Sequence, residues 1–201
     1  MADDDRTEDD TDDFDGMGGM GGGLRGRLLV ATPMLEDPNF RRAVVLILEH
    51  NEEGAIGVVL NRPSQAPLAE ALPAWQLAVS DPRVVFVGGP VQRTAALGLG
   101  WVPHGMPDGG LRVLGDCVGT LDLDSDPHLL PLAGARVFAG YAGWGAGQLE
   151  AEIATGSWYV IEALPADAFT EEPERLWRVV LRRQGGNLAM VSLFPDDPTL
   201  N

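Results

Sequence analysis

Short runs of apolar residues, separated by glycine, proline and polar clusters, dominate the chain from residue 24 onward. The run over residues 43–49 is rich in valine, isoleucine and leucine, which is typical of a strand covered on both faces. A hairpin connection at residues 51–54 follows it, with a glycine available for the turn. Other runs of the same kind predict strands at residues 27–32, 55–60, 84–87, 97–102, 111–114, 136–141, 158–163 and 191–194.

Helical patterns occur in fewer places. Leu149 and Ile153 share one face of a predicted helix over residues 148–154, which follows a glycine-rich turn at 143–147. A second helix is predicted over residues 173–184, because a proline and acids mark its start and a glycine follows its end. Shorter helical segments are expected at residues 68–72 and 127–130. Since helices and strands do not alternate regularly, the pattern predicts a single α/β domain with a mixed sheet flanked by helices, and leaves α+β open.

The first 23 residues have a different composition. Residues 1–15 contain nine acids and one arginine, and residues 16–23 are almost entirely glycine with two methionines. A segment so charged cannot bury enough apolar surface to fold, and a glycine run behaves as a flexible linker. We therefore expect a disordered tail over residues 1–23 and a globular domain over residues 24–201.

Charge and composition exclude several functions. The net charge is -16, so the basic surface that usually accompanies nucleic-acid binding is not expected, and direct nucleic-acid binding is disfavoured. All 14 basic residues are arginine. Without lysine, neither a Schiff base to pyridoxal phosphate nor a Walker A phosphate loop can form. We expect no cofactor.

The sequence also suggests a compartment. No apolar run approaches the roughly 20 residues needed to span a bilayer, so no membrane association is expected. The acidic N-terminus does not resemble a signal peptide. The single cysteine, Cys117, allows no intrachain disulfide and is expected to be a buried or inert thiol. These features favour a cytoplasmic protein.

Three segments at predicted strand ends carry the candidate chemistry. In the first, Asp37, Arg41, Arg42 and His50 can form an anion-binding or acid–base cluster. The alternative is a capped turn with surface ion pairs, and a histidine that only ends a strand.

The other two segments are rich in glycine. Gly88, Gly89 and Pro90 follow a predicted buried strand, and they form either an anion nest or a tight turn. In the third segment, Tyr141 and Trp144 can stack on a planar ligand or belong to the core.

Metal and catalytic motifs are not found. The three histidines lack the spacing of a zinc site, and no nucleophile elbow is present. Asp122, Asp124 and Asp126 alternate as in a calcium loop, but the glycine and the terminal glutamate of such a loop are missing. We expect no metal site.

Four motifs together resemble one family. They lie at residues 28–42, 49–63, 87–90 and 140–150, and their order and spacing resemble the YqgE/AlgH family over about residues 25–195. The resemblance implies a compact α/β domain with a barrel-like, bifurcated sheet in the bacterial cytosol. Members are commonly assigned to transcriptional regulation without an established biochemical mechanism. The resemblance supplies no catalytic residues, but its motifs add Asn61, Gln148 and Glu150 to the candidate site.

Three functional hypotheses follow. The first is a non-enzymatic regulatory or binding protein that recognises a small molecule or a protein partner in a cleft between the three segments. The second is a hydrolase that uses His50 with Asp37 or Glu150, which requires two of these groups within reach of a hydrogen bond or one water. The third, regulation by direct DNA binding, is disfavoured by the charge and by the lack of a helix-turn-helix pattern.

Overall fold

The computed structural model describes residues 23–104, 111–115 and 118–195. The predictions for residues 1–22 and for Cys117 therefore lie outside the described residues. The strands are β1 Arg27–Ala31, β2 Val44–Asn51, β3 Gly54–Val59, β4 Pro63–Pro67, β5 Val84–Val87, β6 Val91–Trp101, β7 Arg112–Gly115, β8 Val118–Leu121, β9 Gly134–Gly145 and β10 Trp158–Glu162. The α-helices are α1 Leu68–Ala71, α2 Gln148–Ala154, α3 Pro165–Ala168, α4 Leu176–Arg183 and α5 Gly186–Val191, and 3₁₀ turns occupy Pro73–Trp75, Pro127–Leu129 and Pro173–Arg175.

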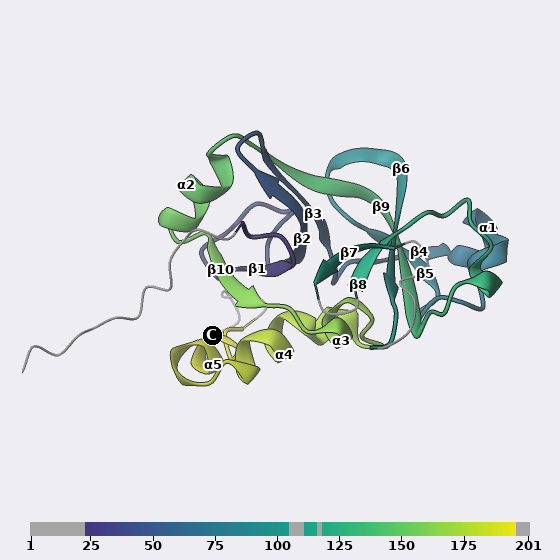
Figure 1. The fold of residues 1–201 in the computed structure, drawn as a ribbon. Helices are drawn as coiled ribbons and strands as arrows, with labels where there is room; N and C mark the ends of the chain where they lie inside the picture. Colours follow the sequence, from purple (N-terminus) through teal and green to yellow (C-terminus); the bar gives the residue numbers. More distant parts are fainter. Residues whose placement is uncertain (1–22, 105–110, 116–117, 196–201) are drawn as a thin grey trace, which may run out of the picture.

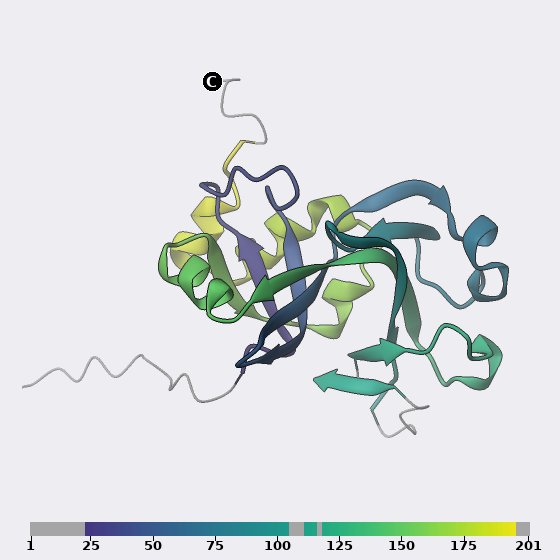
Figure 2. The same ribbon diagram turned by 90° about the horizontal axis from the view of Figure 1, so that it is seen from above.

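The strands form one curled, mixed sheet in the order β10-β1-β2-β3-β9-β6-β8-β7, with β4 and β5 attached to the side of β9. Strand β9 joins the two arms of this sheet. Its last residues pair with β3, whereas residues 134–139 and Tyr141 pair with β6. Phe138 and Ala139 also pair with β5, in the parallel sense. Because the partners change along one long strand, the two arms diverge from it (Figures 1 and 2). The prediction of a single-domain, mixed α/β fold with a bifurcated, barrel-like sheet is confirmed.

The arm formed by β1, β2 and β3 is covered on both faces. Residues that alternate along these strands point to opposite sides: Leu46 belongs to a main apolar cluster with Trp177 of α4, and Val45 to a second cluster with Leu149 of α2. All residues from Ala43 to Leu48 are therefore buried. The prediction of a doubly covered strand is confirmed, and its cause is a helix on each face.

Two predicted segments were wrong. Residues 191–194 do not form a strand, because a new helix begins at Gly186 after Gly185 adopts a left-handed φ of 72°. Leu188 and Val191 lie one helical turn apart in that helix, and both pack on the main cluster. The glycine-rich turn at 143–147 is also shorter than predicted, because Gly145 still pairs with Gly54 of β3.

Among the described residues, no helix is long and apolar enough to cross a membrane.

Candidate functional site

A pocket of about 490 Å³ lies where the turn before β2 meets the ends of β3 and β5. Four arginines line it, Arg41, Arg42, Arg62 and Arg93, against one acid, Glu174. We call it the arginine pocket. This excess of positive charge stands out in a chain with a net charge of -16.

Asp37 shapes the turn that forms one wall of the pocket. Its Oδ1 accepts hydrogen bonds from the amide of Asn39, at 2.8 Å, and from the side chain of Asn39, at 3.1 Å. Its carbonyl accepts from the amides of Phe40 and Arg41. Asp37 therefore has the role of a turn-capping residue, as in the simpler of the two interpretations of this segment.

Asn61 fixes the next part of the wall. Its Oδ1 accepts from the amide of Val44 at 2.9 Å, and its Nδ2 donates to the carbonyl of Arg42 at 2.8 Å. Arg42 has a left-handed φ of 55°, and its guanidinium lies 4.4 Å from the ring centre of Trp177. It also donates to the carbonyls at Phe194 and Pro195. Asn61 and Arg42 thus hold the C-terminal segment and the start of β2 together.

Arg62 is the half-buried cation of the pocket. Its Nη2 donates to the carbonyl of Arg41 at 2.8 Å, and more weakly, at 3.5 Å, to the carbonyls of Pro38 and Asn39. Burial lowers the pKa of Arg62, and the positive charge of Arg41 lowers it further. All its hydrogen bonds to described residues leave from Nη2, so Nε and Nη1 remain available for a ligand.

The glycines after β5 allow a close approach of two strands. The Gly88 amide donates to the Ala139 carbonyl at 2.9 Å, and the Gly88 carbonyl accepts from Val59 at 2.8 Å. That amide is therefore not available for an anion nest. Gly89 and Pro90 line the arginine pocket with their backbone and ring.

The third predicted segment does not reach this pocket. Trp144 is buried in the second cluster, where its ring lies 6.1 Å from both Phe40 and Trp158. Glu152 Oε2 accepts from the indoles of Trp144 and Trp158, at 3.0 and 2.8 Å. Gln148 accepts from the Gly145 amide at 3.1 Å. These residues thus support α2 against the sheet.

Tyr141 packs against the main cluster and does not line the arginine pocket either. The structure therefore brings the Asp37–Arg42 turn and Gly89–Pro90 together at the arginine pocket, whereas His50 of the first segment lies beside Glu150 of the third, outside this pocket. The two cations that sequence reasoning missed are Arg62 and Arg93. Arg62 stands directly after Asn61 in a motif that the resemblance had marked, whereas nothing in the local sequence distinguishes Arg93.

His50 and Glu150 form a separate pair. His50 Nε2 lies 2.7 Å from Glu150 Oε1, and its Nδ1 accepts from the amide of Leu24 at 3.0 Å. This geometry corresponds to a neutral imidazole with its proton on Nε2. A hydrogen bond from its own backbone amide lowers the pKa of Glu150, and the bond from His50 lowers it further. The pair thus links Leu24 to Glu150 of α2.

No group of three or more His, Cys, Asp or Glu side chains in the described part of the chain is arranged to hold a metal ion.

The curled, bifurcated sheet defines the class as a single-domain mixed α/β protein, and the arginine pocket is its candidate site. Comparison with known proteins identifies the family. The chain matches the AlgH-like family model over residues 28–189, and it belongs to this family. A UPF0301 protein of Streptomyces coelicolor is 56% identical over 185 residues, covering 89% of this chain and 95% of that protein. A UPF0301 protein of Thermobifida fusca is 50% identical over 194 residues, with coverages of 89% and 96%.

Two solved structures are similar to this chain throughout the domain. A Corynebacterium diphtheriae protein known from a crystal structure matches with a TM-score of 0.82 and 34% identity, covering 89% of this chain and 95% of that one. The solution structure of AlgH from Pseudomonas aeruginosa matches with a TM-score of 0.64 and 31% identity, covering 90% and 99%. The family predicted from the four motifs is thereby confirmed.

Proposed function

We propose that this chain is a cytoplasmic, non-enzymatic regulatory protein that binds a small anionic ligand in the arginine pocket. The supporting observation is the environment of Arg62. Its guanidinium is half-buried beside the like charge of Arg41, and both effects lower its pKa. A bound anion would offset both costs, because it supplies the opposite charge and takes hydrogen bonds from Nε and Nη1.

The size and charge of the site define the ligand class. A volume of about 490 Å³ lies within the range of roughly 300–1,000 Å³ usual for small-molecule sites. Arginine forks match the paired oxygens of carboxylates and phosphates. A nucleic acid would be repelled by a chain with a net charge of -16, whereas a small anion can enter one locally positive pocket. The ligand would therefore be a metabolite that carries phosphate or carboxylate groups.

Replacing Arg62 with glutamine should weaken anion binding by about 10- to 100-fold, the equivalent of one charge-assisted hydrogen bond of about 1.5–3 kcal/mol. The measurement is calorimetric titration of the full chain with inorganic phosphate, pyrophosphate, citrate and nucleoside mono- and diphosphates. The tightest anion of the panel is then titrated into Arg62→Gln and Arg93→Gln.

Arg112→Gln is the matched control for the charge change. The Arg112 side chain is 81% exposed on β7, and its ion pair with Glu49 is a long one of 3.8 Å. This variant should bind the anion as the native chain does. The proposal fails if no anion of the panel binds, or if Arg62→Gln loses no more affinity than Arg112→Gln.

A hydrolase that uses His50 has one supporting observation, the 2.7 Å contact with Glu150. Both imidazole nitrogens already have partners, however, because Leu24 donates to Nδ1 and Glu150 accepts from Nε2. No nitrogen is left to take a proton from a substrate. Oδ1 of Asp37 accepts two hydrogen bonds within its own turn, and His50 contacts Glu150 rather than Asp37. For this reason we favour binding over catalysis.

We therefore expect hydrolysis of p-nitrophenyl esters and phosphates by the purified chain to stay at the buffer background. His50→Gln should leave that background unchanged. Turnover above background that disappears in His50→Gln and Glu150→Gln, but persists in Arg112→Gln, would instead establish the hydrolase.

A further inference from the structure

The segment that precedes the folded domain carries the densest negative charge of the chain. Residues 1–15, which we call the acidic segment, contain nine acids and one arginine, a net charge of -8 and thus half of the -16 of the whole chain. The arginine pocket has the opposite sign, because four arginines and one glutamate line it. The two charges attract each other wherever they come within a Debye length, about 8 Å at physiological salt.

The cations of the arginine pocket extend from its interior to its rim. Arg62 is half-buried, whereas Arg41 and Arg93 are exposed. Arg42 belongs to the wall, because it is held against Trp177 and by two backbone carbonyls. The structure shows no hydrogen bond or ion pair between Arg93 and another described residue. One small anion can bind Arg62, but a run of carboxylates can contact the interior and the rim at once.

The attachment point of the acidic segment places the pocket within its reach. The Leu24 amide donates to Nδ1 of His50, near the end of β2, at 3.0 Å. The pocket lies at the other end of that strand, in front of Val44. From Val44 to His50 a strand rises roughly 20 Å.

The number of linking residues suits this distance. Asp10 stands 14 residues before Leu24, and residues 16–23 between them are almost entirely glycine. A glycine-rich chain of that length has a root-mean-square span of about 19–22 Å. The effective concentration of a tethered group is greatest where the span of its tether matches the distance to the site. The acids around Asp10 are therefore the ones placed to meet the pocket.

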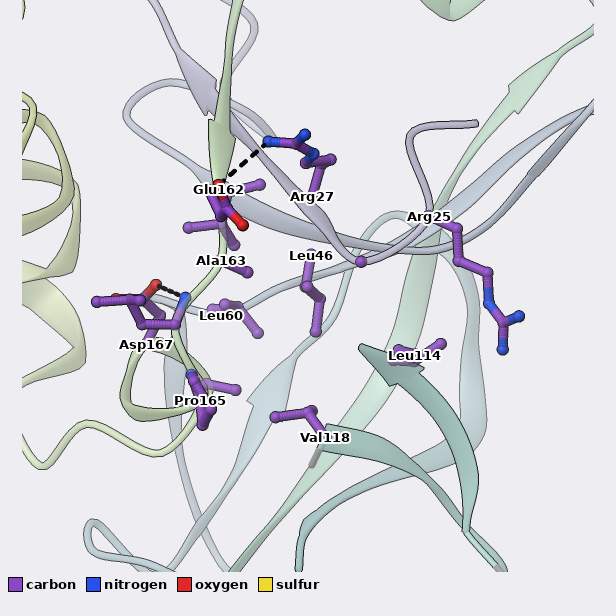
Figure 3. A pocket seen from close by; sticks show the side chains of 14 residues that line it. Arg25, Arg27, Leu46, Leu60, Leu114, Val118, Glu162, Ala163, Pro165 and Asp167 are labelled. Atoms are coloured by element: carbon purple, nitrogen blue, oxygen red, sulfur yellow. Dashed lines mark hydrogen bonds and ion pairs between the residues drawn. The ribbon is translucent and has the colours of Figure 1, made fainter. Parts of the chain in front are cut away.

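The other deep hollow of the domain does not suit an acidic segment. This second pocket, of about 220 Å³, lies beside β1 and β2. In Figure 3 the side chains of Leu46, Leu60 and Val118 surround its centre, and the guanidinium of Arg25 points away from Leu46. Arg25 is held there by hydrogen bonds to two backbone carbonyls. A carboxylate in this pocket would lose water and gain no cation.

The arginines of helix α4 are also a weaker match. Arg175 is already paired with Glu172 at 3.0 Å, and Arg183 with Asp167. Two of the four arginines that line the hollow on this helix thus have a carboxylate partner. The arginine pocket has the larger uncompensated charge.

We propose that the acidic segment docks in the arginine pocket of its own chain and competes there with the anionic ligand. Its carboxylates bind Arg62, Arg41 and Arg93 in place of the oxygens of the ligand. This proposal rests on the function proposed above, because it assigns an internal competitor to the same anion site. Docking weakens as salt screens the two charges.

The first measurement compares two full-length chains by NMR without any ligand. The variant carries Glu8→Gln and asparagine in place of the aspartates at positions 9, 10, 12, 13 and 15, and it leaves the folded domain unchanged. Neutralising the acidic segment should shift the Nε–H signals of Arg62 and Arg93. The signal of Arg112, exposed on β7, should stay in place. Unchanged Arg62 and Arg93 signals would overturn the proposal.

The second measurement is a calorimetric titration of both chains with pyrophosphate at low salt. If the acidic segment occupies the pocket in about nine chains of ten, its neutralisation should tighten pyrophosphate binding about tenfold. A long-range effect of net charge would also tighten binding, so the comparison is repeated in the Arg93→Gln and Arg112→Gln backgrounds. The gain should fall to about threefold or less with Arg93→Gln, which weakens docking, and persist with Arg112→Gln.

The outcomes separate this inference from the proposed function. Equal affinity of the two chains for pyrophosphate would leave the anion site in place and overturn the docking of the acidic segment. Shifts at Arg62 and Arg93, together with no binding of any small anion, would support docking and overturn the small-ligand site. A gain in affinity that varies with protein concentration would mean that the segment of a second copy fills the pocket, which overturns docking within one chain.

Discussion

Alanine in place of Gly88 should lower the free energy of unfolding by about 3 kcal/mol or more, at or above the upper end of typical overpacking costs. A Cβ at this position would lie 2.2 Å from the carbonyl oxygen of Gly140 and 3.1 Å from Cβ of Phe138. The obstacle is backbone of β9, which cannot rotate away as a side chain can. Relieving the contact would separate β5 from β9 and stretch the 2.9 Å bond between the Gly88 amide and the Ala139 carbonyl.

Gly145→Ala is the matched control, because Gly145 lies in β9, the strand whose backbone obstructs a side chain at position 88. The nearest atom to a Cβ there is Gln148 Oε1 at 4.0 Å, so the methyl group finds open space. We expect a change within about 0.5 kcal/mol, as for most surface substitutions. Urea unfolding followed by tryptophan fluorescence compares the two variants. If Gly88→Ala were as stable as Gly145→Ala, the close approach of β5 and β9 would be wrong.

Elements with a strong local signal could be predicted from the sequence. Strand β5 and helix α2 have the predicted bounds, because each combines an apolar pattern with clear breakers on both sides. The run at 43–48 showed by its uninterrupted apolar character that both faces of β2 are covered. The failures came where tertiary contacts decide the structure. Pairing with β3 continues β9 as far as Gly145. The predicted strand at 191–194 is replaced by the end of helix α5 at Val191 and a turn after it.

The candidate site could be predicted in part only. The turn at Asp37–Arg42 and the residues Gly89 and Pro90 do line one pocket. Several motif residues stabilise the fold instead: Asn61 bonds two backbone groups, and Trp144 fills the core. Recurring motif residues cannot be divided into ligand contacts and packing contacts without the structure. Arg93 reaches the pocket only through the long, exposed start of β6, and no local pattern indicates such a placement.

The largest effect of a single charged side chain is expected at Arg136 of β9. This arginine is only 1% exposed, and its Nη2 donates to the carbonyls of Asp81, at 2.7 Å, and Thr170, at 2.9 Å. Its guanidinium also lies 4.3 Å from the ring centre of Phe86. Nε and Nη1 have no hydrogen-bond partner among the described residues. Arg136 therefore joins two loops to the sheet from within the core.

Burying the charge of Arg136 costs desolvation free energy, which offsets part of the stability that its hydrogen bonds and its contact with Phe86 provide. Desolvation lowers the pKa of Arg136 to about 10, which corresponds to about 3 kcal/mol against the charged form. Because the folded-state pKa is the lower one, this penalty is complete below pH 10. It is relieved as the pH rises above about 10, where the unfolded chain binds more protons than the folded one. At neutral pH the hydrogen bonds and the contact with Phe86 act against the full penalty.

Arg136→Ala should lower the free energy of unfolding by about 3 kcal/mol at pH 7, because the unpaired carbonyls and the cavity together exceed the desolvation cost that is removed. Arg136→Met should lose less, about 1–2 kcal/mol, since it refills the cavity without a charge.

Arg83→Ala is the control. Arg83 makes a 3.3 Å ion pair with Asp81 in which the side chains are 44% and 62% exposed, and an exposed pair of this kind contributes about 0–1 kcal/mol. Urea unfolding at pH 7 should therefore show the largest loss for Arg136→Ala, a smaller one for Arg136→Met and the smallest for Arg83→Ala. A ranking in which Arg136→Met is more stable than the native chain would mean that the two carbonyl bonds contribute less than the charge costs, and that Arg136 is retained for a reason other than stability.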